Sequence, residues 1–299
     1  MDTVERRRQL PRALAVGIAI ATGLLVALAI DVARSGGPGR WLARHSLPAR
    51  YLAAGERIDI GPRSLYLDCS GSGSPTVILE AGSGSDSGAW AAVQGELATT
   101  TRTCSYDRAG RGRSDPHGPP HTLADAAADL RALLAAAGEP GPFIVVGHSL
   151  GGAFGRVFAG TYRAETVGVV LVDAFNPDLE VDRIHPLLEP LRAEYEARLD
   201  GLRAYVTQVD SLDWATSEAQ LRATSLAGLP IEVLVAPRGE PRLDQATNTA
   251  IAEAWRTAFE SLSPGHVVHT VAWGAGHEIQ IDRPDLVIES ARRLVALAR

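Results

Sequence analysis

A serine within a glycine-rich turn is the first feature of this sequence whose residue type and setting could do chemistry. Ser149 lies in the segment Gly147-His148-Ser149-Leu150-Gly151-Gly152, after the apolar run Phe-Ile-Val-Val and before an alanine-rich stretch at 153–162. A serine on a sharp strand-to-helix turn has a strained backbone, and flanking glycines let other parts of the chain approach it closely. The helix that follows would point its positive end at the serine oxygen and favour negative charge there. We therefore predict that Ser149 is a nucleophile.

A histidine in a second glycine-rich segment is the candidate general base. His277 follows Gly274-Ala275-Gly276 and precedes Asp282-Arg283-Pro284, which opens the final predicted helix. A histidine on such a loop can come within hydrogen-bond reach of a serine hydroxyl and take its proton. Of the eight histidines, only His277 is placed in this way, and we expect the side chain of His148 to point away from the site.

A carboxylate is needed to orient the imidazole and to stabilise its charged form without taking its proton. Asp173 ends one predicted strand, whereas Glu240 and Asp244 follow the next strand along the chain. Both strand ends belong to the same edge of a parallel sheet, so these residues leave three candidates for the acid.

The elements that must position these residues alternate along the chain. Short runs rich in β-branched residues predict seven strands, at 64–69, 76–79, 103–106, 143–146, 167–172, 231–235 and 267–271. Helical spacing of apolar residues predicts helices at 123–137, 153–162, 245–262 and 284–298. This alternation is typical of a doubly wound, mostly parallel α/β sheet.

One long interval interrupts the alternation. More than fifty residues separate Asp173 from the strand that begins at Ile231, and 186–208 has helical periodicity. An ordinary loop is shorter, so we predict a helical cap inserted at about 176–229. Its apolar residues either line an acyl pocket or form the packed face of a helix, and they are Leu187, Leu188, Leu191, Tyr195 and Leu199.

The N-terminal region predicts export. No charge interrupts Ala13 to Ile30, which as a helix would span about 27 Å, close to the thickness of a bilayer core. Arginines precede this run, so the N-terminus would be cytoplasmic and the rest of the chain outside. A cleaved signal peptide, with a site at Ala27-Leu28-Ala29, and a buried soluble helix are the alternatives. The predicted parts are a basic cytoplasmic segment (1–12), a membrane anchor or signal sequence (13–33), a linker (34–50) and a catalytic domain (51–299).

Composition excludes other classes of function. The net charge of −6 argues against a nucleic-acid partner, because binding phosphates requires clustered lysine and arginine. Two cysteines, Cys69 and Cys104, are too few for a disulfide scaffold and lack metal-ligand spacing. The two cysteines therefore predict no metal site, and the chemistry predicted for Ser149 and His277 requires neither a metal nor a cofactor.

Two further glycine-containing segments stand out, Glu80-Ala81-Gly82-Ser83-Gly84 and Tyr106-Asp107-Arg108-Ala109-Gly110-Arg111-Gly112-Arg113-Ser114. With these segments, the turn around Ser149 and Gly276-His277, the chain from about residue 57 to 299 resembles the α/β-hydrolase superfamily, in the branch that includes lipases, esterases, epoxide hydrolases and haloalkane dehalogenases.

The resemblance implies roles for further residues. The backbone amides of Ser83 and Leu150 would form the oxyanion hole, although Glu80 or Ala81 stands where the family commonly has histidine. Haloalkane dehalogenases place their acid just before the cap, which favours Asp173.

The resemblance also bears on chemistry and on the cysteines. Dehalogenases and epoxide hydrolases use aspartate as nucleophile, so Ser149 indicates acyl transfer instead. The family's sheet order sets the second and fourth strands side by side, which would bring Cys69 near Cys104 for a disulfide, in agreement with export.

Together these features predict an exported serine hydrolase that cleaves carboxylic esters of a small-molecule substrate. The alternatives within enzymes are thioester or amide hydrolysis and cofactor-free peroxide chemistry on the same triad. A non-catalytic binding protein of the same fold and a membrane-tethered interaction module are the alternatives outside enzymes. The substrate's identity and the oligomeric state do not follow from the sequence.

Overall fold

The computed structural model describes residues 55–118, 121–176, 185–237 and 241–299. The predicted segments 1–12, 13–33 and 34–50 lie outside these residues. Among the residues that are described, no helix is long and apolar enough to cross a membrane.

One eight-stranded sheet organises the described chain, in the strand order β1-β2-β4-β3-β5-β6-β7-β8. The pairs β1/β2 and β2/β4 are antiparallel, and the remaining neighbours are parallel. The predicted doubly wound, mostly parallel sheet is confirmed, with β1 as an additional edge strand. The strands are β1 (Glu56–Asp59), β2 (Ser64–Ser70), β3 (Thr76–Glu80), β4 (Thr103–Tyr106), β5 (Phe143–His148), β6 (Thr166–Val172), β7 (Ile231–Val235) and β8 (Val267–Val271).

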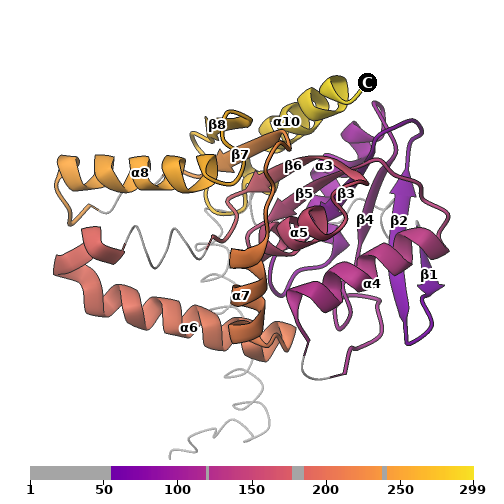
Figure 1. Ribbon diagram of the computed structural model, residues 1–299, viewed down its shortest axis with the longest axis horizontal. Helices are drawn as coiled ribbons and strands as arrows, with labels where there is room; N and C mark the ends of the chain where they lie inside the picture. Colours follow the sequence, from indigo (N-terminus) through magenta and orange to yellow (C-terminus); the bar gives the residue numbers. More distant parts are fainter. Residues whose placement is uncertain (1–54, 119–120, 177–184, 238–240) are drawn as a thin grey trace, which may run out of the picture. The chain divides into compact units, whose positions relative to one another are not determined.

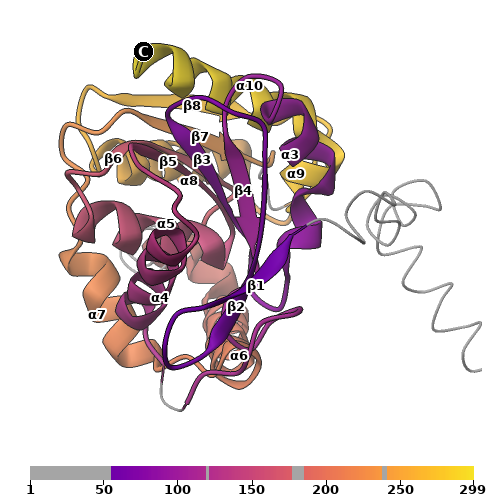
Figure 2. The ribbon, with the colours of Figure 1, turned by 90° about the vertical axis from the view of Figure 1, so that its right-hand side faces the viewer.

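Helices cover both faces of this sheet (Figure 2). The four predicted helices are present, and short helices after β3 were not expected from the sequence. Outside the cap, the helices are the 3-10 helix η2 (Ser87–Trp90), α3 (Ala91–Leu97), α4 (Leu123–Ala136), α5 (Leu150–Thr161), α8 (Gln245–Glu260), α9 (Ile279–Asp282) and α10 (Pro284–Leu297).

Successive residues of the central strands point to opposite faces, as strand geometry requires. In β6, Val169 and Leu171 pack with residues of α8, while Val170 and Val172 pack with residues of α3 and α10. The buried faces of α4 and α5 join a third cluster with Val145 of β5. A strand buried on both faces must be apolar at every position, and this explains the unbroken run in β5.

The insertion between β6 and β7 is helical where it is described. It contains the 3-10 helix η4 (His185–Leu191), α6 (Arg192–Asp210) and α7 (Trp214–Ala223). These elements form the cap, with α6 and α8 on opposite sides of a common cavity (Figure 1).

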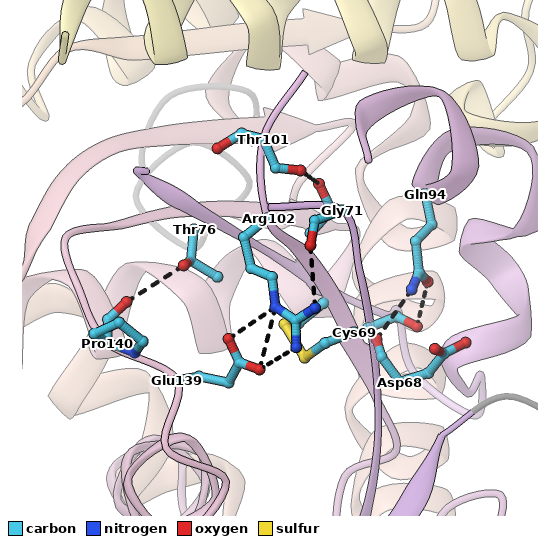
Figure 3. The surroundings of a disulfide bond; sticks show 12 residues. Asp68, Cys69, Gly71, Thr76, Gln94, Thr101, Arg102, Glu139 and Pro140 are labelled. Atoms are coloured by element: carbon cyan, nitrogen blue, oxygen red, sulfur yellow. Dashed lines mark hydrogen bonds and ion pairs between the residues drawn. A yellow bond between two sulfur atoms is a disulfide. The ribbon is translucent and has the colours of Figure 1, made fainter. Parts of the chain in front are cut away.

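A disulfide joins Cys69 of β2 to Cys104 of β4, which are register partners in this antiparallel pair (Figure 3). Glu139 approaches the two sulfurs closely enough that the three residues resemble a metal-ligand set. However, disulfide sulfurs are not thiolates, and Arg102 forms an ion pair with Glu139. The disulfide therefore links β2 to β4, and the ion pair links the residue before β4 to the segment between α4 and β5.

Candidate active site

Ser149 lies at the turn between β5 and α5. Its backbone conformation, with φ 53° and ψ −123°, is one that residues other than glycine rarely adopt. Its backbone N–H donates to the carbonyl of Val172, 3.0 Å away, and its own carbonyl accepts from the N–H of Gly152 and of Phe175. A Cβ atom at Gly147 would lie 2.5 Å from the carbonyl oxygen of Gly151. Glycine is thus required at position 147, because the backbone of Gly151 and Gly152 passes too close to leave room for a side chain.

His277 follows β8, and its ring contacts a carboxylate. The Nδ1 atom of His277 lies 2.7 Å from Oδ2 of Asp173, the residue that follows β6. A carboxylate can only accept, so the proton sits on Nδ1 and leaves Nε2 as an acceptor. The side chain of His277 is 53% exposed, whereas that of Asp173 is 4% exposed.

Two hydrogen bonds to backbone groups at the end of the neighbouring strand hold Asp173 in place. Its Oδ1 accepts from the N–H of Ala236 at 3.0 Å, and its own N–H donates to the carbonyl of Leu234 at 2.8 Å. Both partners belong to the end of β7 and the residue after it, so the neighbouring strand orients the carboxylate toward His277.

The alternative acids are placed differently. Asp244 is the N-cap of α8, and hydrogen bonds from the backbone and side chain of Thr247 lower the pKa of its carboxyl group. Among the described residues, His277 has its carboxylate partner in Asp173 and not in Asp244. Glu240 lies outside the described residues.

The side chain of His148 is buried and is absent from the cavity that Ser149 and His277 line, but it packs against His277, a contact that the sequence did not predict. Its Nε2 lies 2.9 Å from the carbonyl oxygen of His277, and the two rings are 4.7 Å apart. Burial lowers the pKa of His148 to about 4, so the ring is neutral and its Nε2–H donates to that carbonyl. His148 directly precedes Ser149, and this position could have suggested the contact. Residues next to the nucleophile in the chain lie close to the loop that carries the general base.

The residues expected to supply oxyanion amides come from two segments in contact with each other. Leu150 is the first residue of α5, and Ser83 lies in the loop at 81–86 that follows β3. The loop and the turn are in close contact, because a Cβ atom at Gly151 would lie 2.4 Å from the carbonyl oxygens of both Glu80 and Ala81.

A cavity of about 710 Å³ brings these residues together. Ser149, Asp173, His277, Ser83 and Leu150 all line it. No hydrogen bond among the described residues joins the Ser149 hydroxyl to the His277 ring, and such bonds often tighten only when substrate binds.

The cap supplies much of the cavity's apolar wall. Of the five cap residues singled out in the sequence, Leu188, Leu191, Tyr195 and Leu199 line the cavity and Leu187 does not. The wall continues with Trp214 of α7, whose ring lies 5.1 Å from that of Phe175. One face of α6 therefore lines a cavity. The periodicity of apolar residues alone cannot distinguish such a face from one packed against other helices.

Comparisons with known proteins bear on this geometry. A family model described as the alpha/beta hydrolase family matches residues 77–290. A probable transporter, efuK of Hormonema carpetanum, is 38% identical over 124 residues, covering 39% of this chain and 18% of the relative. An AB hydrolase superfamily protein of Gibberella zeae is 29% identical over 172 residues, covering 54% of this chain and 51% of the relative.

Among solved structures, the crystal structure of a putative lipase from Acinetobacter baumannii matches with a TM-score of 0.55 and 17% identity. The match covers 81% of this chain and 91% of the lipase. At this identity the likeness concerns the fold. The chain spans less than two thirds of the length of both curated relatives.

Proposed function

The chain belongs to the alpha/beta hydrolase family, and from that premise we propose that it is a serine hydrolase that cleaves carboxylic esters through an acyl-enzyme on Ser149. The observation that carries the proposal is the hydrogen bond between Asp173 and His277, which lies at a cavity that Ser149 also lines. The contact fixes the tautomer in which Nε2 can take the serine proton.

The reaction proceeds in two halves. Ser149 Oγ attacks the acyl carbon while His277 Nε2 takes its proton, and the amides of Ser83 and Leu150 hold the oxyanion of the tetrahedral intermediate. The imidazolium, stabilised by Asp173, then protonates the leaving alcohol as the ester bond breaks. Water attacks the acyl-enzyme by the same steps in reverse, which releases the acid and restores the serine.

An ester with an apolar acyl or alcohol group fits the site best. Leucines and tryptophans of the cap and α8 line much of the cavity around Ser149, beside the charged Glu194, Arg198 and Arg242. The apolar part of the wall favours a hydrocarbon group. Serine at position 149 supports acyl transfer over the epoxide and halide chemistry for which relatives of this fold use aspartate.

Labelling with a fluorophosphonate probe tests the proposal. We expect the full chain, purified in mild detergent, to be labelled and to hydrolyse nitrophenyl esters faster than the matching nitroanilides. Ser149→Ala should abolish both signals and His277→Ala should reduce them by orders of magnitude, whereas His266→Ala, at an exposed histidine, should leave both unchanged. A folded wild-type protein that is neither labelled nor active on esters would refute the proposal.

We further propose that residues 13–33 anchor the chain in a membrane with the catalytic domain outside the cytoplasm. The disulfide between Cys69 and Cys104 supports an oxidising compartment. The expected result is a membrane-bound protein that resists alkaline extraction and whose cysteines fail to react with maleimide until they are reduced. Release of the whole chain by alkaline extraction would contradict the anchor, and free thiols in freshly isolated protein would contradict the location.

A further inference from the structure

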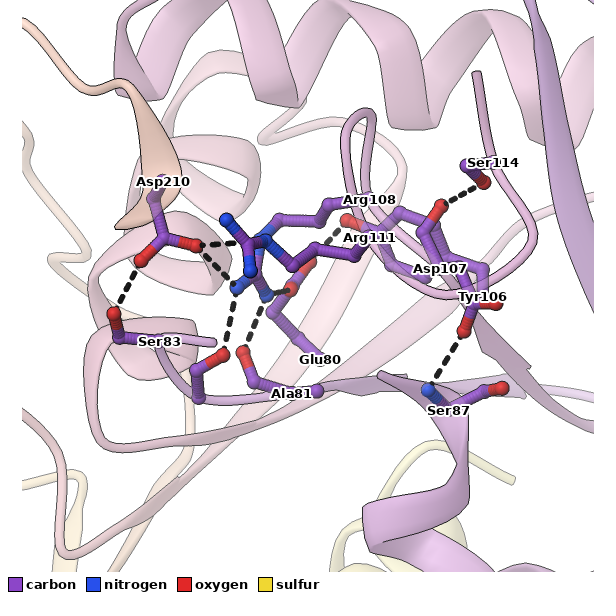
Figure 4. A network of polar contacts seen from close by, with 11 residues as sticks. Glu80, Ala81, Ser83, Ser87, Tyr106, Asp107, Arg108, Arg111, Ser114 and Asp210 are labelled. Carbon is purple, nitrogen blue, oxygen red and sulfur yellow. Dashed lines mark hydrogen bonds and ion pairs between the residues drawn. The ribbon is translucent and has the colours of Figure 1, made fainter. Parts of the chain in front are cut away.

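A buried cluster of charged side chains contacts the loop at 81–86 (Figure 4). Glu80 ends β3, Arg108 follows β4, and Asp210 is the last residue of the cap helix α6. Their side chains are 1%, 6% and 4% exposed. Burying three charges costs free energy that well-packed apolar residues would not, so stability alone is a weak reason for this cluster.

Arg108 holds the backbone of the loop. Its Nη1 donates to the Glu80 carboxylate and to the carbonyl of Ala81, and its Nη2 donates to the carbonyl of Gly82 at 2.7 Å. The hydroxyl of Tyr106 donates to the other oxygen of Glu80. The guanidinium therefore binds one carboxylate and two successive peptide carbonyls.

These bonds also orient the amide of Ser83. The carbonyl of Gly82 and the N–H of Ser83 belong to one planar trans peptide, in which the two groups point in opposite directions. When Arg108 holds the carbonyl on the buried side, the N–H must point the other way. Ser83 lines the cavity that contains Ser149.

The cap completes the arrangement. Asp210 accepts a hydrogen bond from the hydroxyl of Ser83, and its Oδ1 lies 3.5 Å from Nη2 of Arg108 and 3.4 Å from Nε of Arg111. One carboxylate at the end of α6 thus contacts both the residue that carries the amide and the arginine that orients it.

We propose that Arg108 and Asp210 are positioning residues for the oxyanion hole, and that the hole becomes competent only when the cap end of α6 contacts the loop at 81–86. This inference rests on the proposed serine-hydrolase function. It makes the cap a part of the machinery that stabilises the transition state, in addition to a wall of the cavity.

Substitutions that loosen the loop without removing any amide test the inference. Asp210→Asn removes the charge, and Ser83→Ala removes only the hydroxyl that contacts Asp210, while Ser83→Thr keeps it. Glu232→Gln is the matched control, because Glu232 of β7 is 3% exposed and pairs with Arg293 of α10 at 2.7 Å.

The readouts are kcat and KM for a nitrophenyl ester and the affinity of a trifluoromethyl ketone. Addition of Ser149 Oγ to that ketone forms a hemiketal oxyanion as the proton passes to His277, so the affinity reports the oxyanion hole. The affinity of the matching methyl ketone reports the cavity alone.

For Asp210→Asn and Ser83→Ala we expect kcat to fall roughly 10- to 100-fold with little change in KM, less than the loss of a whole oxyanion donor. The affinity of the trifluoromethyl ketone should fall by the same factor, with methyl ketone binding unchanged. Ser83→Thr keeps the hydroxyl, so its kcat and its affinity for the trifluoromethyl ketone should be close to those of the wild type. Glu232→Gln should leave both quantities at the wild-type level.

Wild-type kcat and trifluoromethyl ketone affinity in both Asp210→Asn and Ser83→Ala would overturn the inference while leaving the Ser149 chemistry intact. An equal loss in Glu232→Gln would also overturn it, because the effect would then be general destabilisation. If Asp210→Asn does not fold, Ser83→Ala against Ser83→Thr decides the question. Wild-type turnover that survives Ser149→Ala would overturn the proposed function as well.

Discussion

Replacing Asp173 by asparagine should slow ester turnover because the amide would hold His277 in the wrong tautomer. In the native structure Oδ1 of Asp173 accepts the N–H of Ala236, and Oδ2 accepts from Nδ1 of His277. An asparagine must keep its oxygen toward the Ala236 N–H, since that group can only donate. Its NH₂ group therefore faces Nδ1 of His277.

That orientation moves the imidazole proton. An amide NH₂ donates, so Nδ1 must accept and the proton sits on Nε2 instead. Nε2 is then unable to take the proton of Ser149. The corresponding change in a well-studied serine protease lowers kcat about 10⁴-fold, or about 5.5 kcal/mol of transition-state stabilisation, and we expect a loss of that order here.

The assay is steady-state hydrolysis of a nitrophenyl ester between pH 6 and 9, with KM measured alongside kcat. Asp244→Asn is the control, because asparagine is also a good N-cap and Asp244 caps α8 away from the imidazole. A loss below 10-fold in Asp173→Asn, or an equal loss in Asp244→Asn, would refute the assignment of the acid.

Other features of the chain make further predictions. Replacing Cys69 and Cys104 by alanine opens a loop with a sequence separation of 35 and should cost about 4 kcal/mol in urea unfolding while leaving kcat intact; a cost below about 1 kcal/mol would contradict this. Gly151→Ala should clash with the carbonyls of Glu80 and Ala81, cost roughly 1–3 kcal/mol and lower kcat, whereas Gly201→Ala in α6, with open space around it, should be neutral or stabilising. His148 stays neutral when folded but is protonated below pH 6.5 when unfolded, so stability present above pH 6.5 should fall by about 3 kcal/mol toward pH 4. His148→Gln should flatten that slope, and an unchanged slope would show that other groups cause it.

Much of the fold could be predicted from local signals in the sequence. The unbroken apolar run of β5 requires cover on both faces, and its glycine-rich end predicts a tight turn at Ser149. The strand and helix pattern on either side follows from residue periodicity, and all seven predicted strands are present. Short elements such as β1 and α3 were missed because a few residues carry too little periodicity.

The acid could not be chosen from the residues alone. Asp173 and Asp244 both follow parallel strands, and only the pairing of β6 with β7 places the N–H of Ala236 where it aims one of them. A resemblance to a known family favoured Asp173, but the hydrogen bonds that orient it are tertiary.

The sequence by itself determined which residue types stand on which turns, because turns and periodicity are set by neighbours along the chain. Only the tertiary structure decided what those turns touch: His148 against the His277 carbonyl, and Asp210 of the cap against Ser83. These contacts join segments more than a hundred residues apart, and their geometry depends on how the sheet and the cap pack together. A buried polar group needs a partner, but only the fold determines which one it finds.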